Sequence, residues 1–219
     1  MDHFELMRAR HSVRRFTNVP LQEAAVAALR EELALCNRES GLHLQLVTEE
    51  PEAFSAEKPH YGVIHGCRNY LALVGEKDRD EAIGYYGERL VLTAQALGVS
   101  SCWVALTYKK SKARFDLAPK EKLYMVIALG YGETAGTPHR SKPLSAVSDL
   151  TDDAPDWYRR GLEAALLAPT AVNQQKFRFT RNGSLVRAKA GLTPCAKVDL
   201  GIVKYHFELG AGRENFRWA

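Results

Sequence analysis

The sequence predicts an α+β fold in which helices flank a sheet and two similar halves share one chain. Residues 80–97 carry apolar side chains at helical spacing, and Gly98 follows where a left-handed helix cap belongs. Residues 42–47 instead alternate between apolar and polar side chains, which is typical of a strand with one buried face. When the first half is aligned with the second at one constant offset in residue number, Leu29 matches Leu162 and both lie in a helix-then-strand pattern. The two halves therefore resemble a repeat.

The first half is expected to hold most of the elements. Helices are expected where apolar residues recur every three or four positions, in residues 2–10, 20–36 and 80–97. The polar residues 37–41 should end the second of these helices. Strands are expected in residues 42–47, 69–74, 102–106 and 122–129. Two stretches without periodicity are expected to be irregular, residues 51–66 and 136–143.

The second half repeats the helix–strand–helix order over a shorter length. A helix, a hairpin and a second helix are expected at residues 157–167, 177–188 and 199–209. Asn182 followed by glycine signals the turn of the hairpin. The later helices of the two halves align at a shorter offset than Leu29 and Leu162, and this offset matches Gly84 with Gly201. We therefore predict a first half at residues 1–150 and a second half at residues 151–219.

Composition excludes several classes of protein. With 219 residues, the chain suits one domain or two fused halves, and it can bury a core without a disulfide or metal. Its 46% hydrophobic and 26% charged residues are typical of a soluble globular protein. No apolar run approaches a membrane span, and the first residues lack the pattern of a signal peptide. We therefore expect a cytoplasmic protein without a membrane partner.

Cysteine spacing, motifs and net charge narrow the class of ligand. The four cysteines are scattered without a zinc-like cluster, so we expect reduced thiols, mostly buried, and no metal. No Gly-x-Gly-x-x-Gly motif follows a strand, which argues against a Rossmann site or a P-loop. No histidine has a partner at the spacing of a triad. The net charge of +4 fits an anionic small molecule and does not demand nucleic acid.

Residues 10–16 (RHSVRRF) carry the first candidate binding residues. If the chain extends after a helix that ends near Arg10, then Arg10, Ser12 and Arg14 can converge. Two guanidinium forks and a hydroxyl suit a phosphate or a carbonyl-rich ring edge. The alternative is an ordinary basic helix end, favoured by the helix dipole or simply solvated.

Residues 168–175 (APTAVNQQ) are the second candidate, just past a predicted helix. Pro169 should end that helix, and Thr170 and Ala171 are small enough for the backbone to approach a flat ring. Asn173 offers a donor and an acceptor on one side chain, which suits the edge of a heteroaromatic ring. The alternative is that Asn173 satisfies the backbone of its own loop.

At these residues the chain resembles the FMN-dependent nitroreductase family, and the similarity spans most of the chain. Residues 10–16 resemble its Arg-(Arg/His)-Ser-x-(Arg/Lys)-x-Phe motif, and residues 168–177 resemble its Ala-Pro-Ser-x-x-Asn-x-Gln-Pro-Trp segment. Residues 88–103, 126–132 and 140–143 resemble its central helix, a strand end and a late basic pair. The resemblance implies a central, mostly antiparallel sheet flanked by helices. It also implies FMN as cofactor and NAD(P)H as cosubstrate.

The order of the motifs departs from the usual family. There the Pro-Ser loop follows soon after the arginine motif, but residues 35–40 of this chain lack its pattern. The relocated order resembles a branch in which one chain contains two half-repeats. In ordinary members one subunit gives the arginine motif and the other gives the Pro-Ser loop, so the second half should play the partner's role in a monomer or a homodimer. Thr170 for serine keeps the hydroxyl, whereas Lys176 for proline removes a rigid turn.

The resemblance implies a set of cofactor-binding residues. They are Arg10, His11, Ser12, Arg14, Val104, Ala105, Leu106, Arg140, Lys142, Pro169, Thr170, Ala171 and Asn173. The basic and hydroxyl groups should bind the phosphate or ribityl chain, and Arg14 should reach the N1/O2 edge of the ring. The Pro-Thr-Ala-x-Asn loop should pack on the ring, and the backbone after Val104 should approach N5. No side chain is expected to be catalytic, because flavin N5 carries the chemistry.

The implied function is an NAD(P)H-dependent, two-electron reduction of a nitroaromatic, a quinone or a similar small molecule. Two alternatives stay open. One is a flavin-binding sensor or carrier without turnover. The other is a nucleic-acid-binding protein that uses Arg8, Arg10, Arg14 and Arg15, which ranks low because these residues are not interleaved with aromatic residues and the net charge is small. We therefore expect no nucleic-acid partner.

Overall fold

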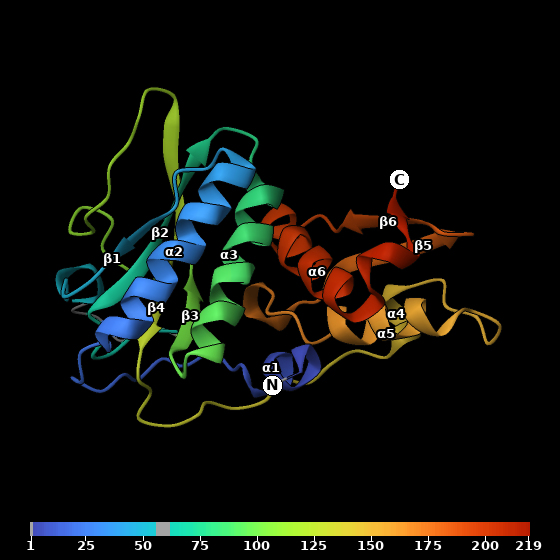
Figure 1. The fold of residues 1–219 in the computed structure, drawn as a ribbon, viewed down its shortest axis with the longest axis horizontal. Coiled ribbons are helices and arrows are strands. Elements are labelled where there is room, and N and C mark those ends of the chain that lie inside the picture. The colour runs from blue at the N-terminus through green and yellow to red at the C-terminus, as the bar shows by residue number, and fades with distance from the viewer. Residues whose placement is uncertain (1, 56–61) are drawn as a thin grey trace. The chain divides into compact units, whose positions relative to one another are not determined.

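The computed structural model describes residues 2–55 and 62–219, and Figure 1 shows its elements. The chain forms two compact units. Unit 1 comprises Met1–Arg8, Asp80–Glu88 and His139–Ala219, and unit 2 comprises Ala9–Arg79 and Arg89–Pro138. Helix α3 (Asp80–Ala96) contributes its first half to unit 1 and its second half to unit 2.

Unit 2 contains a four-stranded sheet in which every neighbouring pair is antiparallel. In the order of pairing, its strands are β1 (Gln45–Val47), β2 (Asn69–Glu76), β4 (Glu121–Gly130) and β3 (Ser100–Val104). All residues of β2 except Glu76 are buried, so both faces of this central strand are covered. The antiparallel sheet and its flanking helices confirm the predicted α+β class.

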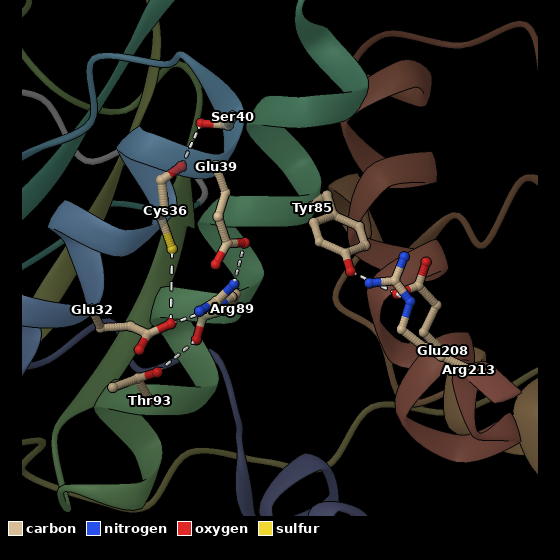
Figure 2. Close-up of polar contacts among 9 residues, drawn as sticks. All are labelled: Glu32, Cys36, Glu39, Ser40, Tyr85, Arg89, Thr93, Glu208 and Arg213. Carbon is tan, nitrogen blue, oxygen red and sulfur yellow. Dashed lines mark hydrogen bonds and ion pairs between the residues drawn. The ribbon is translucent and has the colours of Figure 1, made fainter.

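Helix α2 (Glu23–Ser40) lies beside the second half of α3 in unit 2 (Figures 1 and 2). Arg89 of α3 forms ion pairs with Glu32 and Glu39 of α2, the latter at 2.7 Å. Leu29 of α2 is fully buried. Apolar burial and these ion pairs therefore hold the two helices together.

The C-terminal end of α2 differs from the sequence prediction. The sequence predicts a break at residues 37–41, but the helix continues to Ser40. The Ser40 hydroxyl donates to the carbonyl oxygen of Cys36 at 2.6 Å, which satisfies one of the last helical carbonyl groups. Gly41 then ends the helix in the left-handed conformation, with φ 68°. Local hydrogen bonding therefore outweighs the polar composition.

Two strand boundaries also differ from prediction. The strand predicted at residues 42–47 is paired only over Gln45–Val47, where β2 lies alongside. The strand predicted at residues 102–106 begins earlier and ends at Val104, which is the extent of its pairing with β4. In the segment predicted to be irregular, Glu52–Phe54 forms a 3-10 helix, and residues 56–61 lie outside the described residues.

Unit 1 contains a three-stranded sheet and several helices. Strands β5 (Phe177–Asn182) and β6 (Leu185–Ala190) form the predicted antiparallel hairpin, and β7 (Arg217–Trp218), which was not predicted, pairs in parallel with β6. The α-helices are α1 (His3–Ala9), α4 (Leu144–Val147), α5 (Asp156–Ala165) and α6 (Ala196–Ala211). Two 3-10 helices lie at Ala171–Asn173 and Arg213–Asn215.

Aromatic side chains form the core of unit 1. The rings of Phe179 and Phe207 are stacked with centroids 4.8 Å apart, and both are fully buried. The rings of Tyr158, Phe216 and Trp218 pack around that of Phe207 at 5.1–6.0 Å. Because these residues come from α5, α6 and both ends of the small sheet, the cluster fixes the loops that join them.

Helices α3 and α6 cross within unit 1 at a pair of glycines. A Cβ on Gly84 would overlap the carbonyl oxygen of Val198, and a Cβ on Gly201 would overlap that of Glu81. The offset from Gly84 to Gly201 equals that from Glu81 to Val198, so the contact is reciprocal, as at a twofold axis. This reciprocity is what the predicted repeat would produce.

Candidate functional site

Residues 10–16 form an extended segment fixed by backbone hydrogen bonds in unit 2. The Val13 N–H donates to the carbonyl oxygen of Ser101 at 3.0 Å, and the Phe16 N–H donates to that of His65 at 2.9 Å. The His65 N–H donates in return to the carbonyl oxygen of Arg14 at 2.8 Å. The segment is therefore held in an extended conformation, with Val13 and Phe16 buried and Arg14 and Arg15 exposed.

Arg10, Ser12 and Arg14 all act on the buried thiol of Cys102 in β3. Burial raises the pKa of Cys102, and the positive charges of Arg14 and Arg10 and a hydrogen bond with Ser12 oppose that rise. The Arg10 side chain is buried, whereas Arg14 is exposed. The three residues thus act on one thiol in unit 2, and their joint binding of a phosphate or ring edge stays a prediction. We call these three residues the arginine cluster.

His11 and Arg15 lie on a turn at residues 133–135. The ring nitrogen Nδ1 of His11 is 3.0 Å from the carbonyl oxygen of Ala135, and Arg15 pairs with Glu133 at 2.9 Å. The structure therefore places His11 on a backbone carbonyl group and apart from the contacts of the arginine cluster. The sequence alone did not distinguish the position of His11 from those of Arg10, Ser12 and Arg14.

The residues after β3 are accessible. Val104 ends the strand and is buried, and Ala105 and Leu106 are both exposed. The Leu106 side chain is 90% exposed, which is unusual for a large apolar residue. The arginine cluster and this backbone belong to the same unit, since Cys102 and Val104 lie on the same strand.

The second candidate segment, in unit 1, is a loop with a strained backbone. Val172, Asn173 and Gln175 have φ values of 46°, 53° and 44°, in the left-handed region that favours glycine. A β-branched residue such as Val172 is a genuine outlier there, and each such residue costs about 1–3 kcal/mol. Strain of this size persists only where surrounding contacts hold the loop, and it is concentrated at functional sites.

Asp199 in the first turn of α6 is one of those contacts. Its buried carboxylate accepts hydrogen bonds from the Ala171 N–H at 3.1 and 3.2 Å and from the Gln174 side chain at 2.9 Å. Burial raises the pKa of Asp199, and these two hydrogen bonds partly oppose the rise. Sequence reasoning missed this residue, although a carboxylate inside an apolar helix face is a signal that could have found it.

Amide and ammonium groups hold the other side of the loop. Asn173 and Gln175 donate to the carbonyl oxygen of Arg140 at 3.0 and 2.8 Å, and Gln175 also donates to the Asn173 side chain at 2.6 Å. The Lys142 ammonium donates to the carbonyl oxygens of Gln174 and Gln175 at 2.7 and 3.1 Å. The structure thus brings the backbone of Arg140 and the ammonium group of Lys142 to the loop. The binding of a phosphate or ribityl chain by these two residues stays a prediction.

This conformation engages the Asn173 amide within its own loop, which is the alternative that the sequence left open. Gln175, which sequence reasoning also missed, is only 2% exposed. The Thr170 hydroxyl accepts from the Gln175 N–H at 3.0 Å. We call residues 169–175 with Arg140 and Lys142 the amide loop.

The other buried polar groups have structural roles. His206 bonds to Glu88 at 2.9 Å in unit 1, and both side chains are fully buried, so His206 belongs to the core. Tyr85 donates to Glu208, which also pairs with Arg213 (Figure 2). Burial raises the pKa of every cysteine, to about 12 for Cys36 and Cys67, so the expectation of mostly buried thiols is confirmed.

The described residues, 2–55 and 62–219, contain no group of three or more His, Cys, Asp or Glu side chains that could hold a metal ion. Over the same residues, no helix is both long and apolar enough to cross a membrane.

Comparisons with known proteins identify the family. The family model described as "Putative TM nitroreductase" matches residues 2–211. A structure described as a putative nitroreductase from Thermotoga maritima MSB8 has a TM-score of 0.67 at 23% identity, covering 98% of this chain and 85% of that one. A comparison with curated proteins gives no significant match.

Two further structures share the fold over a smaller part of this chain. One, a putative nitroreductase in complex with FMN from Desulfovibrio desulfuricans, has a TM-score of 0.53 at 18% identity, covering 70% of this chain and 96% of that one. The other is described as a putative NADH dehydrogenase/NAD(P)H nitroreductase from Parabacteroides distasonis ATCC 8503, with a TM-score of 0.52 at 17% identity and coverages of 69% and 98%. With a family match over nearly its whole length, this chain belongs to the nitroreductase family described as Putative TM nitroreductase.

Proposed function

We propose that the protein is an FMN-dependent oxidoreductase that moves two electrons from NAD(P)H to a small acceptor such as a nitroaromatic or a quinone. Family membership supports this class of function, as does the FMN bound by the Desulfovibrio relative. The observation that carries the proposal is that Arg10, Ser12 and Arg14 lie on one extended segment fixed by backbone hydrogen bonds and act together on the buried Cys102, which gives two cations and a hydroxyl in one region of unit 2. We further propose a cytoplasmic location.

The donor set of the arginine cluster fits the cofactor's charge and shape. Guanidinium groups bind phosphate and carbonyl-rich edges through paired N–H donors, and a hydroxyl completes such a site. Arg10 and Ser12 would hold the phosphate or ribityl chain, and the exposed Arg14 would reach the N1/O2 edge of the ring. The exposed backbone at Ala105 and Leu106 would approach N5.

The amide loop offers a second set of groups that fit the ring. Thr170 and Ala171 leave the backbone uncovered by large side chains, and the amide of Asn173 has a donor and an acceptor. On cofactor binding, the Asn173 amide would give up its hydrogen bond to the Arg140 carbonyl oxygen and form one with the ring instead. The family resemblance gives each of these two clusters a part in FMN binding.

The chemistry that bound FMN supplies is hydride acceptance from NAD(P)H at N5, followed by two-electron transfer to the acceptor. The contribution of the chain is to position reactants within about 3–3.5 Å of each other and to place the charge of Arg14 where the ring becomes negative on reduction. No side-chain acid or base is needed, so no residue is assigned a catalytic role.

Absorption spectroscopy of the purified protein tests this function. The protein should carry FMN or bind it on addition, and NADH or NADPH should bleach the flavin band without oxygen. Adding a quinone should restore the band. A protein that binds no FMN would overturn the proposal, and a flavin that nicotinamides do not reduce would favour a carrier or sensor.

A further inference from the structure

One long stretch of unit 1 contains no acidic residue. Between Glu163 and Asp199 there is no Asp or Glu, although the whole chain has a net charge of only +4. The basic residues of this stretch are Lys176, Arg178, Arg181, Arg187, Lys189 and Lys197. Most of them lie on the hairpin of β5 and β6, so this hairpin concentrates positive charge.

The register of the hairpin brings two of these cations together. Arg178 of β5 is directly opposite Lys189 of β6, and both are exposed. Like charges in this position repel each other and destabilise a hairpin. Among the described residues, no carboxylate forms an ion pair with either of them. The charge is therefore uncompensated within the described chain.

A cavity lies on this charged side of the hairpin. Its volume is about 290 Å³, and its polar lining comes from Lys142, Gln175, Lys176, Arg178 and Lys189. No acidic side chain lines it. We call this cavity the hairpin cleft. It has room for a small anion and a part of the molecule that carries it.

We propose that the hairpin cleft binds a phosphate monoester, and that the 2′-phosphate of NADPH is its source. The phosphate is a compact, nearly dianionic group with several acceptor oxygens. A guanidinium fork at Arg178 and ammonium groups at Lys176 and Lys189 match it in charge and in hydrogen bonding. The choice of source rests on the proposed function, because that function supplies NAD(P)H.

The hairpin cleft adjoins the amide loop within unit 1. Gln175 and Lys142 line the cleft and also form the hydrogen bonds that hold the loop. A dinucleotide whose 2′-phosphate lies in the cleft would therefore have that phosphate next to the amide loop, which is proposed to pack on the flavin. NADH lacks the 2′-phosphate, so the cleft would select NADPH.

Equilibrium binding of NADP⁺, NAD⁺ and inorganic phosphate tests this selection without turnover. Calorimetry at constant ionic strength should show NADP⁺ binding at least about tenfold more tightly than NAD⁺, the effect of one or two charge-assisted hydrogen bonds. The double variant Arg178→Gln/Lys189→Gln should reduce that ratio to near one. The matched variant Lys197→Gln removes an exposed cation outside the cleft and should keep it.

The outcomes separate this proposal from the proposed function. Equal affinity for NADP⁺ and NAD⁺ in the native protein, while either nicotinamide reduces the flavin, would overturn the cleft's role and leave the function standing. Selective NADP⁺ binding by a protein that takes up no FMN would support the cleft's role and overturn the proposed function. Phosphate binding that the double variant loses, without preference for NADP⁺, would keep the anion site and overturn NADPH as its source. Because the variant removes like-charge repulsion, its thermal midpoint should not fall.

Discussion

The arginine cluster and the amide loop are both proposed to bind FMN, yet they are held in opposite ways. The strand that carries Arg10 and Arg14 has ordinary extended geometry and is fixed by backbone hydrogen bonds, which no side-chain substitution removes. The amide loop has a strained backbone that side chains hold, among them the carboxylate of Asp199. A side-chain substitution in the arginine cluster should therefore weaken FMN binding without changing the local structure. A substitution in the amide loop should weaken FMN binding and disturb the loop at the same time.

The largest expected effect is on cofactor affinity in the arginine cluster. Arg14→Gln removes charge-assisted hydrogen bonds and should weaken FMN binding by about tenfold to a hundredfold. The thermal midpoint should stay unchanged, because Arg14 is exposed and its strand is held by the backbone. Fluorescence titration with FMN measures the affinity, and differential scanning calorimetry measures the midpoint.

Arg15→Gln is the matched control for that prediction. It removes the same charge from the adjacent residue, whose side chain pairs with Glu133. FMN affinity should change less than twofold. Equal losses in the two variants would mean that net charge, and not the position of Arg14, sets the affinity.

The next largest effect should combine stability and affinity in the amide loop. Asp199→Ala leaves the Ala171 N–H without its acceptor, removes one of two acceptors of the Gln174 amide, and should lower the free energy of unfolding by about 2 kcal/mol. FMN affinity should fall as well, because the loop loses its shape. Urea unfolding and FMN titration measure the two quantities. Glu163→Ala, at an exposed acid on α5, should change neither, and a stable Asp199→Ala protein would contradict the contrast drawn between the two regions.

A smaller effect should appear in the pH dependence of stability. Burial raises the pKa of Asp199 in the folded state above its unfolded value, so its favourable contribution is present at low pH and is lost as pH rises through the folded pKa. The free energy of unfolding of the native protein, relative to Asp199→Asn, should therefore increase as pH falls from 7 toward 5. Urea unfolding of both proteins across this range measures the difference. A difference that decreases would show that the hydrogen bonds outweigh burial.

The smallest expected effect is a gain. Val172→Gly relieves a left-handed backbone and should raise the free energy of unfolding by about 1 kcal/mol. Val19→Gly, at an exposed valine outside the left-handed region, should instead lower it slightly. Chemical unfolding of both variants provides the comparison. If Val172→Gly also weakens FMN binding, then the strain positions the loop for its ligand.

The repeat shows how far sequence comparison reaches. Offsets between the halves align Gly84 with Gly201, and the helices that carry them cross by reciprocal close contacts. The sequence matches alone could not have established a repeat, since helix-then-strand patterns are common. The reciprocal contact adds a three-dimensional relation that fits the predicted repeat.

Apart from helix α4, strand β7 and several element boundaries, the sequence by itself determined the helices and strands, the hairpin turn and the family. These depend on local periodicity, on turn chemistry, or on motifs whose residues are close in sequence. Only the tertiary structure decided that Asp199 holds Ala171, that Asn173 and Gln175 bond to Arg140, and that Val172 adopts a left-handed backbone. Such contacts join residues far apart in the chain, and packing rather than local preference selects them.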